Sequence, residues 1–336
     1  MKAIICERPF ALTVIDRPVP PRRAGEVQIR IARVGLCGTD YHIFAGDQPY
    51  LEYPRVMGHE LAGTVVDADP GVGLEPGRSV TVNPYIPCGS CIACRKHKPN
   101  CCVAIRVLGV HVDGGMAELL SVPAAQVIPV DGLSLDQAAM VEFLSIGAHA
   151  VRRSEVRAGD RALVVGAGPI GVAVSLFAQM AGAKVTLVDT SSQRLIHARD
   201  AVGIEEVVLA DAATEQRLAE RTEGEFFDLV FDATGNAAAM MAGFAYVAHG
   251  GSYVLVSVVK QDISFADPEF HKREMRLIGS RNATKDDFLY VIDRIRDGSI
   301  PTSALHTHSF PLIDMPERMA ALIADQGAVL KAIGSF

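Results

Sequence analysis

A glycine pattern that follows a short apolar segment places the strongest constraint on the fold. Residues 161–165 are typical of a buried strand, and an apolar segment with helical character follows at 169–181. Between strand and helix the spacing G-x-G-x-x-G permits a tight turn, a close approach of backbone to a pyrophosphate, and close packing of helix on strand. The helix N-terminus adds free N–H groups and partial positive charge. We expect a dinucleotide site formed by Gly166, Gly168, Pro169, Ile170 and Gly171; a glycine-rich turn without a ligand is the alternative.

An acidic residue ends the next predicted strand, at 184–188. The carboxylate of Asp189 is placed to accept hydrogen bonds from both ribose hydroxyls and to repel a 2′-phosphate, which favours NAD over NADP. A plain helix N-cap is the alternative for Asp189, although Ser191 or Ser192 can cap equally well. Arg194 either contacts the adenine or is a solvated helix residue.

Strands and helices alternate along the second half of the chain. We expect strands at 161–165, 184–188, 206–209, 229–232, 252–257 and 276–280, with helices that include 169–181, 192–201 and 237–248. Apolar strands alternating with helices predict a parallel sheet covered on both faces. The fold class is therefore α/β, with a Rossmann doubly wound parallel-sheet domain over residues 146–285 that binds NAD.

The first part of the chain has a different character. Residues 1–145 contain short apolar segments such as 26–34, 60–66 and 79–82, separated by dense Gly and Pro turn signals, which predicts an irregular β-rich domain. After the second domain we expect helices at 286–296 and 316–324 and a strand at 328–333 that returns to the first domain. The β-rich domain therefore comprises residues 1–145 and 286–336.

A group of cysteines lies within the β-rich domain at metal-ligand spacing. Four thiolates this close in sequence can complete a tetrahedral zinc shell and leave no position for a substrate, so the role is structural. Binding would order the lobe 88–102, which has few apolar residues of its own. Cys101 leaves the register ambiguous, and the preferred ligands are Cys88, Cys91, Cys94 and Cys102.

Composition excludes several classes of protein. The 336 residues carry a net charge of −7 without a long run of one sign and contain no tryptophan, which argues against a dedicated nucleic-acid binder. The sequence has no signal-peptide pattern and no uninterrupted apolar stretch of about 18 residues, so we expect a cytoplasmic protein without a membrane span. In that compartment the seven cysteines are thiols or metal ligands.

A second set of possible metal ligands is dispersed along the chain. Cys37 lies in Cys-Gly-Thr-Asp, His59 and Glu60 lie in Gly-His-Glu, and Glu142 lies in Val-Glu-Phe. None of these residues is diagnostic by itself, because a lone cysteine or histidine near apolar residues is more often part of a core.

With these motifs taken in order, the chain resembles the zinc-containing medium-chain alcohol dehydrogenases over its whole length. The resemblance is strongest to the polyol, threonine and sugar-acid branch, including members similar to L-gulonate/L-galactonate 5-dehydrogenase; segments 108–115 and 279–283 look like the sugar-acid members. It implies a GroES-like catalytic domain, two zinc ions per chain, NAD, and hydride transfer from a secondary alcohol of a polyol or sugar acid. It also implies a homodimer or homotetramer acting on a small polar alcohol.

The resemblance also implies roles for individual residues. Cys37 and His59 ligate a catalytic zinc, with Glu60 as a direct or close outer ligand and Glu142 bound directly or through water. Phe143 departs from the proline of many polyol-type members, and Asp40 is expected to orient His59. A proton relay runs through Thr39 to His42, although His42 by itself is also typical of a surface histidine.

Substrate recognition and the competing functions follow from the same resemblance. His111 or Arg281 can pair with a substrate carboxylate; a cofactor-phosphate contact or an interface salt bridge is the alternative for Arg281. The alternative enzyme is L-threonine 3-dehydrogenase. A zinc-ribbon protein that uses its nucleotide domain as a redox sensor is a non-enzyme alternative, and retained NADH binding without alcohol-dependent NAD reduction would favour it.

Overall fold

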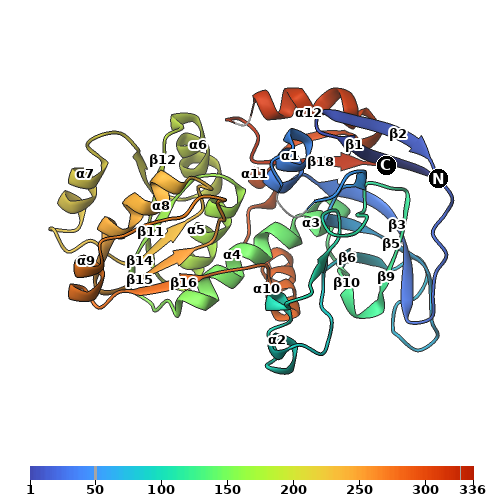
Figure 1. Cartoon of the computed structure of the whole chain (residues 1–336), viewed down its shortest axis with the longest axis horizontal. Helices are drawn as coiled ribbons and strands as arrows, with labels where there is room; N and C mark the ends of the chain where they lie inside the picture. Colours follow the sequence, from blue (N-terminus) through green and yellow to red (C-terminus); the bar gives the residue numbers. More distant parts are fainter. Residues whose placement is uncertain (49–50, 326) are drawn as a thin grey trace. The chain divides into compact units, whose positions relative to one another are not determined.

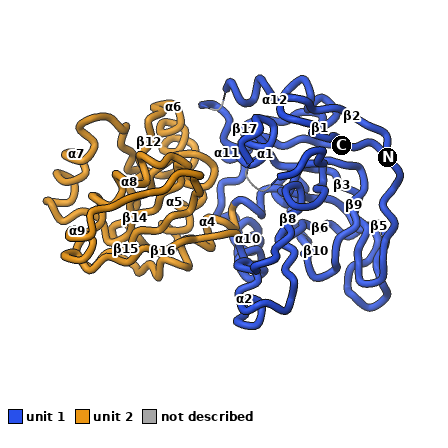
Figure 2. Tube along the Cα trace, in the orientation of Figure 1, with its two compact units in different colours: residues 1–143, 283–336 blue, residues 144–282 orange. Residues whose placement is uncertain are grey.

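The computed structural model describes residues 1–48, 51–325 and 327–336, shown in Figure 1. The chain forms two compact units, coloured separately in Figure 2: unit 1 comprises Met1–Phe143 and Ala283–Phe336, and unit 2 comprises Leu144–Asn282. These limits lie near the predicted domain boundaries at 145/146 and 285/286. The division into a catalytic and an NAD-binding domain at those boundaries stays a prediction.

Unit 2 contains one parallel sheet of six strands. Its order is β13-β12-β11-β14-β15-β16, so the chain runs outward in both directions from β11, as a doubly wound sheet requires. The strands are β11 (Arg161–Val165), β12 (Lys184–Asp189), β13 (Glu206–Leu209), β14 (Phe227–Asp232), β15 (Val247–Leu255) and β16 (Arg276–Gly279). The helices are α5 (Pro169–Met180), α6 (Ser192–His197), α7 (Thr214–Arg221), α8 (Ala237–Gly243) and α9 (Asp267–Lys272).

Burial on both faces explains the sequence of these strands. Leu163 of β11, Val188 of β12 and Val230 of β14 lie in one hydrophobic cluster with at most a few per cent of their surface exposed. Burial of each such side chain contributes about 1.5–3 kcal/mol, and strands covered on both faces need continuous rather than alternating apolar residues.

One helix is shorter than the sequence predicts. A helix is predicted over 237–248; α8 ends at Gly243, a 3-10 helix continues over Phe244–Tyr246, and β15 begins at Val247. Tyr253 packs against the last turn: a Cβ on Gly243 would lie 2.2 Å from the Tyr253 hydroxyl, which donates to the Met240 carbonyl at 2.9 Å. Val247 is fully buried and pairs with β14, so its apolar side chain belongs to a strand, a distinction that periodicity does not make for short segments.

Unit 1 is built mainly from antiparallel strands. The largest sheet has the order β10-β6-β5-β3-β18-β17, with β9 also paired to β3, and smaller sheets are β2-β1-β4 and β7-β8. The strands are β1 (Lys2–Arg8), β2 (Ala11–Asp16), β3 (Glu26–Gly35), β4 (Arg55–Val56), β5 (Glu60–Ala68), β6 (Ser79–Val82), β7 (Tyr85–Ile86), β8 (Arg106–Val107), β9 (Leu119–Pro123), β10 (Val127–Pro129), β17 (His306–Pro311) and β18 (Lys331–Ser335).

The C-terminal segment completes the sheet of unit 1. Strand β18 pairs antiparallel with β3, which confirms the predicted return to the first domain, but it begins at Lys331 rather than at residue 328. This pairing brings Lys331 to the end of β3, beside the start of β5. The helices of the unit are α1 (Gly38–Ala45), α2 (Ile92–Arg95), α3 (Leu135–Ala139), α10 (Lys285–Arg296), α11 (Thr302–Leu305) and α12 (Met315–Ala324), and α4 (Val141–Ser154) begins there and continues into unit 2.

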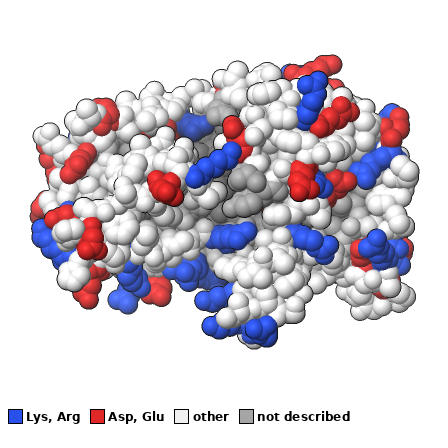
Figure 3. All heavy atoms as spheres, viewed as in Figure 1, with Lys and Arg blue, Asp and Glu red and all other residues white. Residues whose placement is uncertain are grey.

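The visible surface of each unit carries charges of both signs. Figure 3 shows Lys and Arg interspersed with Asp and Glu on the visible face of both units. Within the described ranges, no helix has the length and apolar character that crossing a membrane requires.

Candidate active site and metal centres

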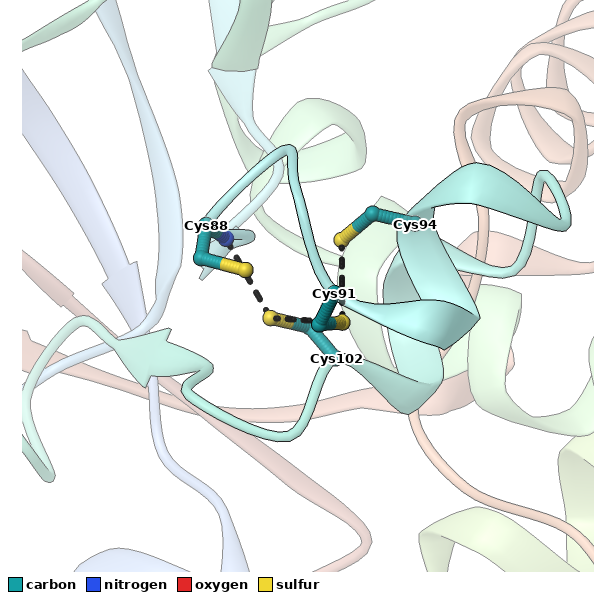
Figure 4. A group of neighbouring side chains, drawn as sticks. All are labelled: Cys88, Cys91, Cys94 and Cys102. Atoms are coloured by element: carbon teal, nitrogen blue, oxygen red, sulfur yellow. Dashed lines mark hydrogen bonds between the residues drawn. The ribbon is translucent and has the colours of Figure 1, made fainter.

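The four cysteines of the lobe 88–102 converge in space, as Figure 4 shows. Their sulfur atoms lie within 4.8 Å of one another, with Cys91 3.5 Å from Cys94 and 3.9 Å from Cys102. Tetrahedral coordination at a Zn–S distance of about 2.3 Å requires sulfur separations of about 3.8 Å, so the group fits zinc. Cys101 is exposed and lies outside this group, so Cys102 is the cysteine that converges with the other three, and zinc binding by these four stays a prediction.

Backbone hydrogen bonds favour the thiolate form at Cys88 and Cys91, whereas burial raises the pKa of the Cys94 thiol to about 11. Backbone N–H groups of Ser90 and Cys91 lower the pKa of the Cys88 thiol to about 6. The backbone N–H of Cys88 in turn donates to the sulfur of Cys102 at 3.2 Å. Thiolate is the form that binds zinc, and all the cysteines of the chain are free thiols in the structure, so the donors are available to a metal.

The dispersed ligands also converge. One donor atom each from Cys37, His59 and Glu60 lies within 4.8 Å of the others. Cys37 follows β3 as the N-cap residue of α1, while Glu60 begins β5 directly opposite Gly35 in the antiparallel ladder. The pairing of two neighbouring strands therefore brings together residues that are distant in sequence.

Asp40 contacts this cluster, but not through the full orienting interaction that was expected. Asp40 Oδ2 accepts from the backbone N–H of Cys37 at 3.0 Å, whereas Oδ1 lies 3.9 Å from His59 Nδ1, beyond hydrogen-bond distance. Burial lowers the pKa of His59, but the negative charges of Asp40 and Cys37 outweigh it and raise this pKa well above its usual range.

These features define what the cluster can hold. His59 Nδ1 and Asp40 Oδ1 are buried atoms without a hydrogen-bond partner among the described residues, in surroundings of negative charge. Such a site stabilises a cation, and a thiolate, an imidazole and a carboxylate are the donor types of catalytic zinc sites. The residues therefore fit a zinc ion, as the sequence predicted; which of them ligate it stays a prediction.

Glu60 has a buried partner that the sequence reasoning missed. Lys331 Nζ lies 2.6 and 2.7 Å from the two carboxylate oxygens of Glu60, and both side chains are almost completely buried. The ammonium also donates to the Leu36 carbonyl and lies 4.3 Å from the ring centroid of Phe143. A lysine within an otherwise apolar C-terminal strand was the available signal, because buried lysines are normally paired.

Space for this ion pair depends on a glycine. A Cβ on Gly35 would lie 2.1 Å from Oε2 of Glu60, so no larger residue fits there. Burial raises the pKa of Glu60 to about 7, and Lys331 opposes that shift.

Glu142 lies in the first turn of α4 and is buried, but it is not one of the three donors that converge within 4.8 Å. The hydroxyl of Tyr85 donates a short hydrogen bond to its Oε1. The charge of Glu142 raises the pKa of both His59 and Glu60, so the carboxylate lies within electrostatic reach of the cluster. Its role as a metal ligand stays a prediction.

The two residues of the expected proton relay lie in α1. Thr39 is half-buried, two residues after Cys37, and His42 is exposed. Residues three apart are neighbours on one face of a helix, so a half-buried and an exposed side chain lie on the same face of α1.

The glycine loop of unit 2 has the predicted strand–turn–helix conformation. Gly166 has φ of +104°, and a Cβ there would lie 2.9 Å from the Ala233 carbonyl oxygen. A Cβ on Gly171 would lie 1.6 Å from the Gly166 carbonyl oxygen. Gly168 caps α5, with Pro169 as the first helical residue, and a Cβ on Gly168 would meet only Nη1 of Arg194, at 4.0 Å, among the described residues. The loop therefore presents a helix N-terminus and an open backbone surface that fit a pyrophosphate.

Asp189 ends β12 and holds the glycine loop. Its carboxylate accepts from the backbone N–H groups of Ala167 at 2.6 Å and Ser191 at 2.7 Å. Ser191, not Asp189, caps α6, which removes the plain N-cap alternative. Arg194 Nη1 lies 4.0 Å from the position of a Cβ on Gly168, so its guanidinium faces the loop; an adenine contact stays a prediction.

The two residues proposed for the substrate carboxylate have different surroundings. His111 is half-buried in unit 1, where its Nδ1 accepts from the backbone N–H of Val107 at 3.2 Å. Arg281 is exposed at the end of unit 2, before Asn282 at φ of 55°. Both substrate roles stay predictions.

Comparison with known proteins agrees with this geometry. Residues 23–132 match the family described as "Alcohol dehydrogenase GroES-like domain", and residues 169–297 match "Zinc-binding dehydrogenase". The chain is 39% identical to L-galactonate-5-dehydrogenase of Escherichia coli K12 over 100% of this chain and 99% of that protein. It is 30% identical to L-threonine 3-dehydrogenase of Bacillus velezensis over 94% of this chain and 93% of that protein.

A solved structure extends the comparison to the fold. A protein from Escherichia coli CFT073, described as a short chain alcohol dehydrogenase (rspB) complexed with the cofactor NADH, superposes with a TM-score of 0.93 at 29% identity, covering 100% of this chain and 99% of the other. The chain belongs to the zinc-binding alcohol dehydrogenase family. It is a zinc-dependent, nicotinamide-linked oxidoreductase with GroES-like and Rossmann folds, which confirms the fold and the enzyme class predicted from the sequence.

Proposed function

We propose that the protein oxidises a secondary alcohol of a sugar acid such as L-galactonate, with NAD as the hydride acceptor. The convergence of Cys37, His59 and Glu60 in one mostly buried cluster carries the proposal, since this is the donor set of a catalytic zinc site. The 39% identity to an L-galactonate-5-dehydrogenase over both full lengths supports the substrate class. A polyol is the next candidate in the same class.

The chain's residues divide the chemical task among them. Cys37, His59 and either Glu60 or Glu142 would hold a zinc ion, which supplies Lewis acidity that lowers the pKa of an alcohol, while the nicotinamide supplies the hydride acceptor. Thr39 accepts the proton released from the substrate hydroxyl while its own hydroxyl proton passes on towards the cofactor ribose and then His42, which releases it to solvent, as the half-buried and exposed positions of the two side chains in α1 allow. His111 and Arg281 are the candidates for binding the carboxylate.

The choice of NAD over NADP is supported by Asp189. Two backbone N–H groups fix its carboxylate at the end of β12, where a charged oxygen favours ribose hydroxyls and repels a 2′-phosphate.

We further propose that the enzyme is cytoplasmic, because seven free thiols suit a reducing compartment. We also propose a homodimer or homotetramer, because the family resemblance implies an oligomer.

L-threonine 3-dehydrogenase is the second candidate, supported by the 30% identical relative. NADH formation should be followed at 340 nm with L-galactonate, L-gulonate, sorbitol, xylitol, galactitol, L-threonine and simple alcohols, each with NAD and with NADP, before and after chelator treatment. We expect a sugar acid to give the highest kcat/KM with NAD and the chelator to abolish it. L-threonine as the best substrate would replace the main proposal, and no turnover of any substrate would reject both.

A further inference from the structure

Tyr85 is a buried side chain to which the mechanism assigns no role. It lies in β7 with 6% of its surface exposed, and its hydroxyl donates to Oε1 of Glu142, which is 3% exposed. A buried carboxylate requires polar partners because it has lost its hydration. The hydrogen bond from Tyr85 therefore restrains the position of Glu142 Oε1.

The backbone that carries Tyr85 is itself fixed by buried amides. The N–H of Tyr85 donates to Oδ1 of Asn83 at 3.0 Å, and Gln126 Nε2 donates to the carbonyls of Tyr85 at 2.9 Å and Asn83 at 3.1 Å. Both amide side chains are buried. Such support locks the geometry of a site residue, so the phenol is presented from a rigid segment.

The two buried glutamates of the site have partners of different charge. Lys331 is a cation that engages both oxygens of Glu60 and neutralises its charge. Tyr85 offers a phenol, which is a neutral hydrogen-bond donor at neutral pH. Among the described residues Glu142 has no cationic partner, and the Tyr85 hydroxyl is its hydrogen-bond donor.

We propose that Tyr85 is a positioning residue of the catalytic metal centre. Its hydroxyl donates a hydrogen bond to Oε1 of Glu142 and so fixes the orientation of this carboxylate, which has no cationic partner among the described residues. The carboxylate would then compensate the positive charge of a bound zinc ion. This inference rests on the proposed function only in assuming that the Cys37–His59 cluster holds the catalytic metal. It assigns different roles to the two glutamates, with Glu142 as the charge partner of the metal and Glu60 as part of a neutral pair with Lys331.

Tyr85→Phe tests the proposal, since it keeps the ring and removes only the donor. The zinc-loaded variant should be titrated with a chromophoric chelator, and its cobalt-exchanged form examined by d–d absorption. We expect the catalytic site to bind zinc about ten- to a hundredfold more weakly, with an altered cobalt spectrum, while the cysteine lobe keeps its zinc. The matched control is Tyr253→Phe, which removes another buried phenol, hydrogen-bonded to the Met240 carbonyl, and should leave both metals unchanged.

Parent-like zinc affinity and an unchanged cobalt spectrum in Tyr85→Phe would overturn the proposal. Should that variant not fold, Glu142→Gln carries the test: it keeps an acceptor for the phenol but removes the charge, and it should lose the same zinc selectively. Retention of both zinc ions by Glu142→Gln would then overturn the proposal. Because metal affinity is measured without substrate, a failure of the substrate proposal cannot be mistaken for a failure of this one.

Discussion

The two candidate metal centres of unit 1 are built in opposite ways. The cysteine lobe takes all its donors from residues 88–102, and three of its four cysteines are half-buried or exposed. The second centre takes Cys37, His59 and Glu60 from the ends of two paired strands and is mostly buried. Four thiolates from one loop complete the coordination shell of a zinc ion and stabilise that loop. A buried cluster of mixed donors held by the sheet can instead leave one coordination position open for a substrate.

The largest effect that separates the two centres should come from Cys37→Ala. Loss of one ligand of the catalytic metal should lower kcat/KM by roughly a thousandfold or more, equivalent to about 4 kcal/mol of transition-state stabilisation. Steady-state kinetics with the best substrate measures this. Cys6→Ala, which removes a buried cysteine outside both centres, is the control, and parent-like turnover by Cys37→Ala would reject the catalytic assignment.

Cys91→Ala should instead act on stability. Without a full thiolate shell the lobe loses its metal, and we expect the Tm to fall by roughly 5–10 °C, the effect of a few kcal/mol. Differential scanning calorimetry and gel filtration check this prediction. Cys101→Ala changes a neighbouring exposed cysteine outside the group and should melt like the parent; identical melting of Cys91→Ala would contradict a structural role.

A smaller effect is expected at the nucleotide site, in the other unit. Asp189→Asn removes a charged acceptor, so the ratio of kcat/KM for NAD over NADP should fall about ten- to a hundredfold. The ratio is measured with both cofactors at a fixed substrate concentration. Asp200→Asn alters an exposed aspartate that pairs with its neighbour Arg199 and should leave the ratio unchanged; an unchanged ratio in Asp189→Asn would remove Asp189 from cofactor selection.

The smallest effect should be that of His42→Ala. Water can replace the exposed end of the relay, so kcat should fall only about tenfold, less than the roughly 10²–10⁴-fold that a general acid–base residue typically contributes, and should recover with added imidazole. The pH profile of kcat with and without imidazole tests this. His271→Ala, an exposed histidine in unit 2, is the comparison, and an effect of His42→Ala no larger than that of this control would exclude the relay.

The same contrast explains what the sequence could predict. The cysteine lobe and the glycine loop are contiguous, so spacing alone placed their residues, and the parallel sheet followed from strands such as 161–165 that are buried on both faces. The grouping of Cys37 with His59 and Glu60 required the family resemblance, because the register of β3 and β5, not sequence distance, brings them together.

Other features lie beyond local patterns. Lys331 reaches Glu60 only because β18 returns to β3, and Tyr85 reaches Glu142 across 57 residues of sequence. Such buried polar pairs depend on tertiary structure. The start of β15 was missed for a similar reason, since Val247 belongs to a strand that pairs with β14 through Phe227.

The central claim is that the cysteine lobe has a structural role and the Cys37 cluster a catalytic one. Zinc content measured together with turnover tests this claim most directly. Metal analysis of the parent, Cys37→Ala and Cys91→Ala proteins, with kinetics on the same samples below the melting range, counts the sites and assigns the activity. The account predicts two zinc ions in the parent and one in each variant, with turnover lost in Cys37→Ala and retained in Cys91→Ala. Two zinc ions and parent-like turnover in Cys37→Ala, or turnover abolished in a folded Cys91→Ala, would contradict it.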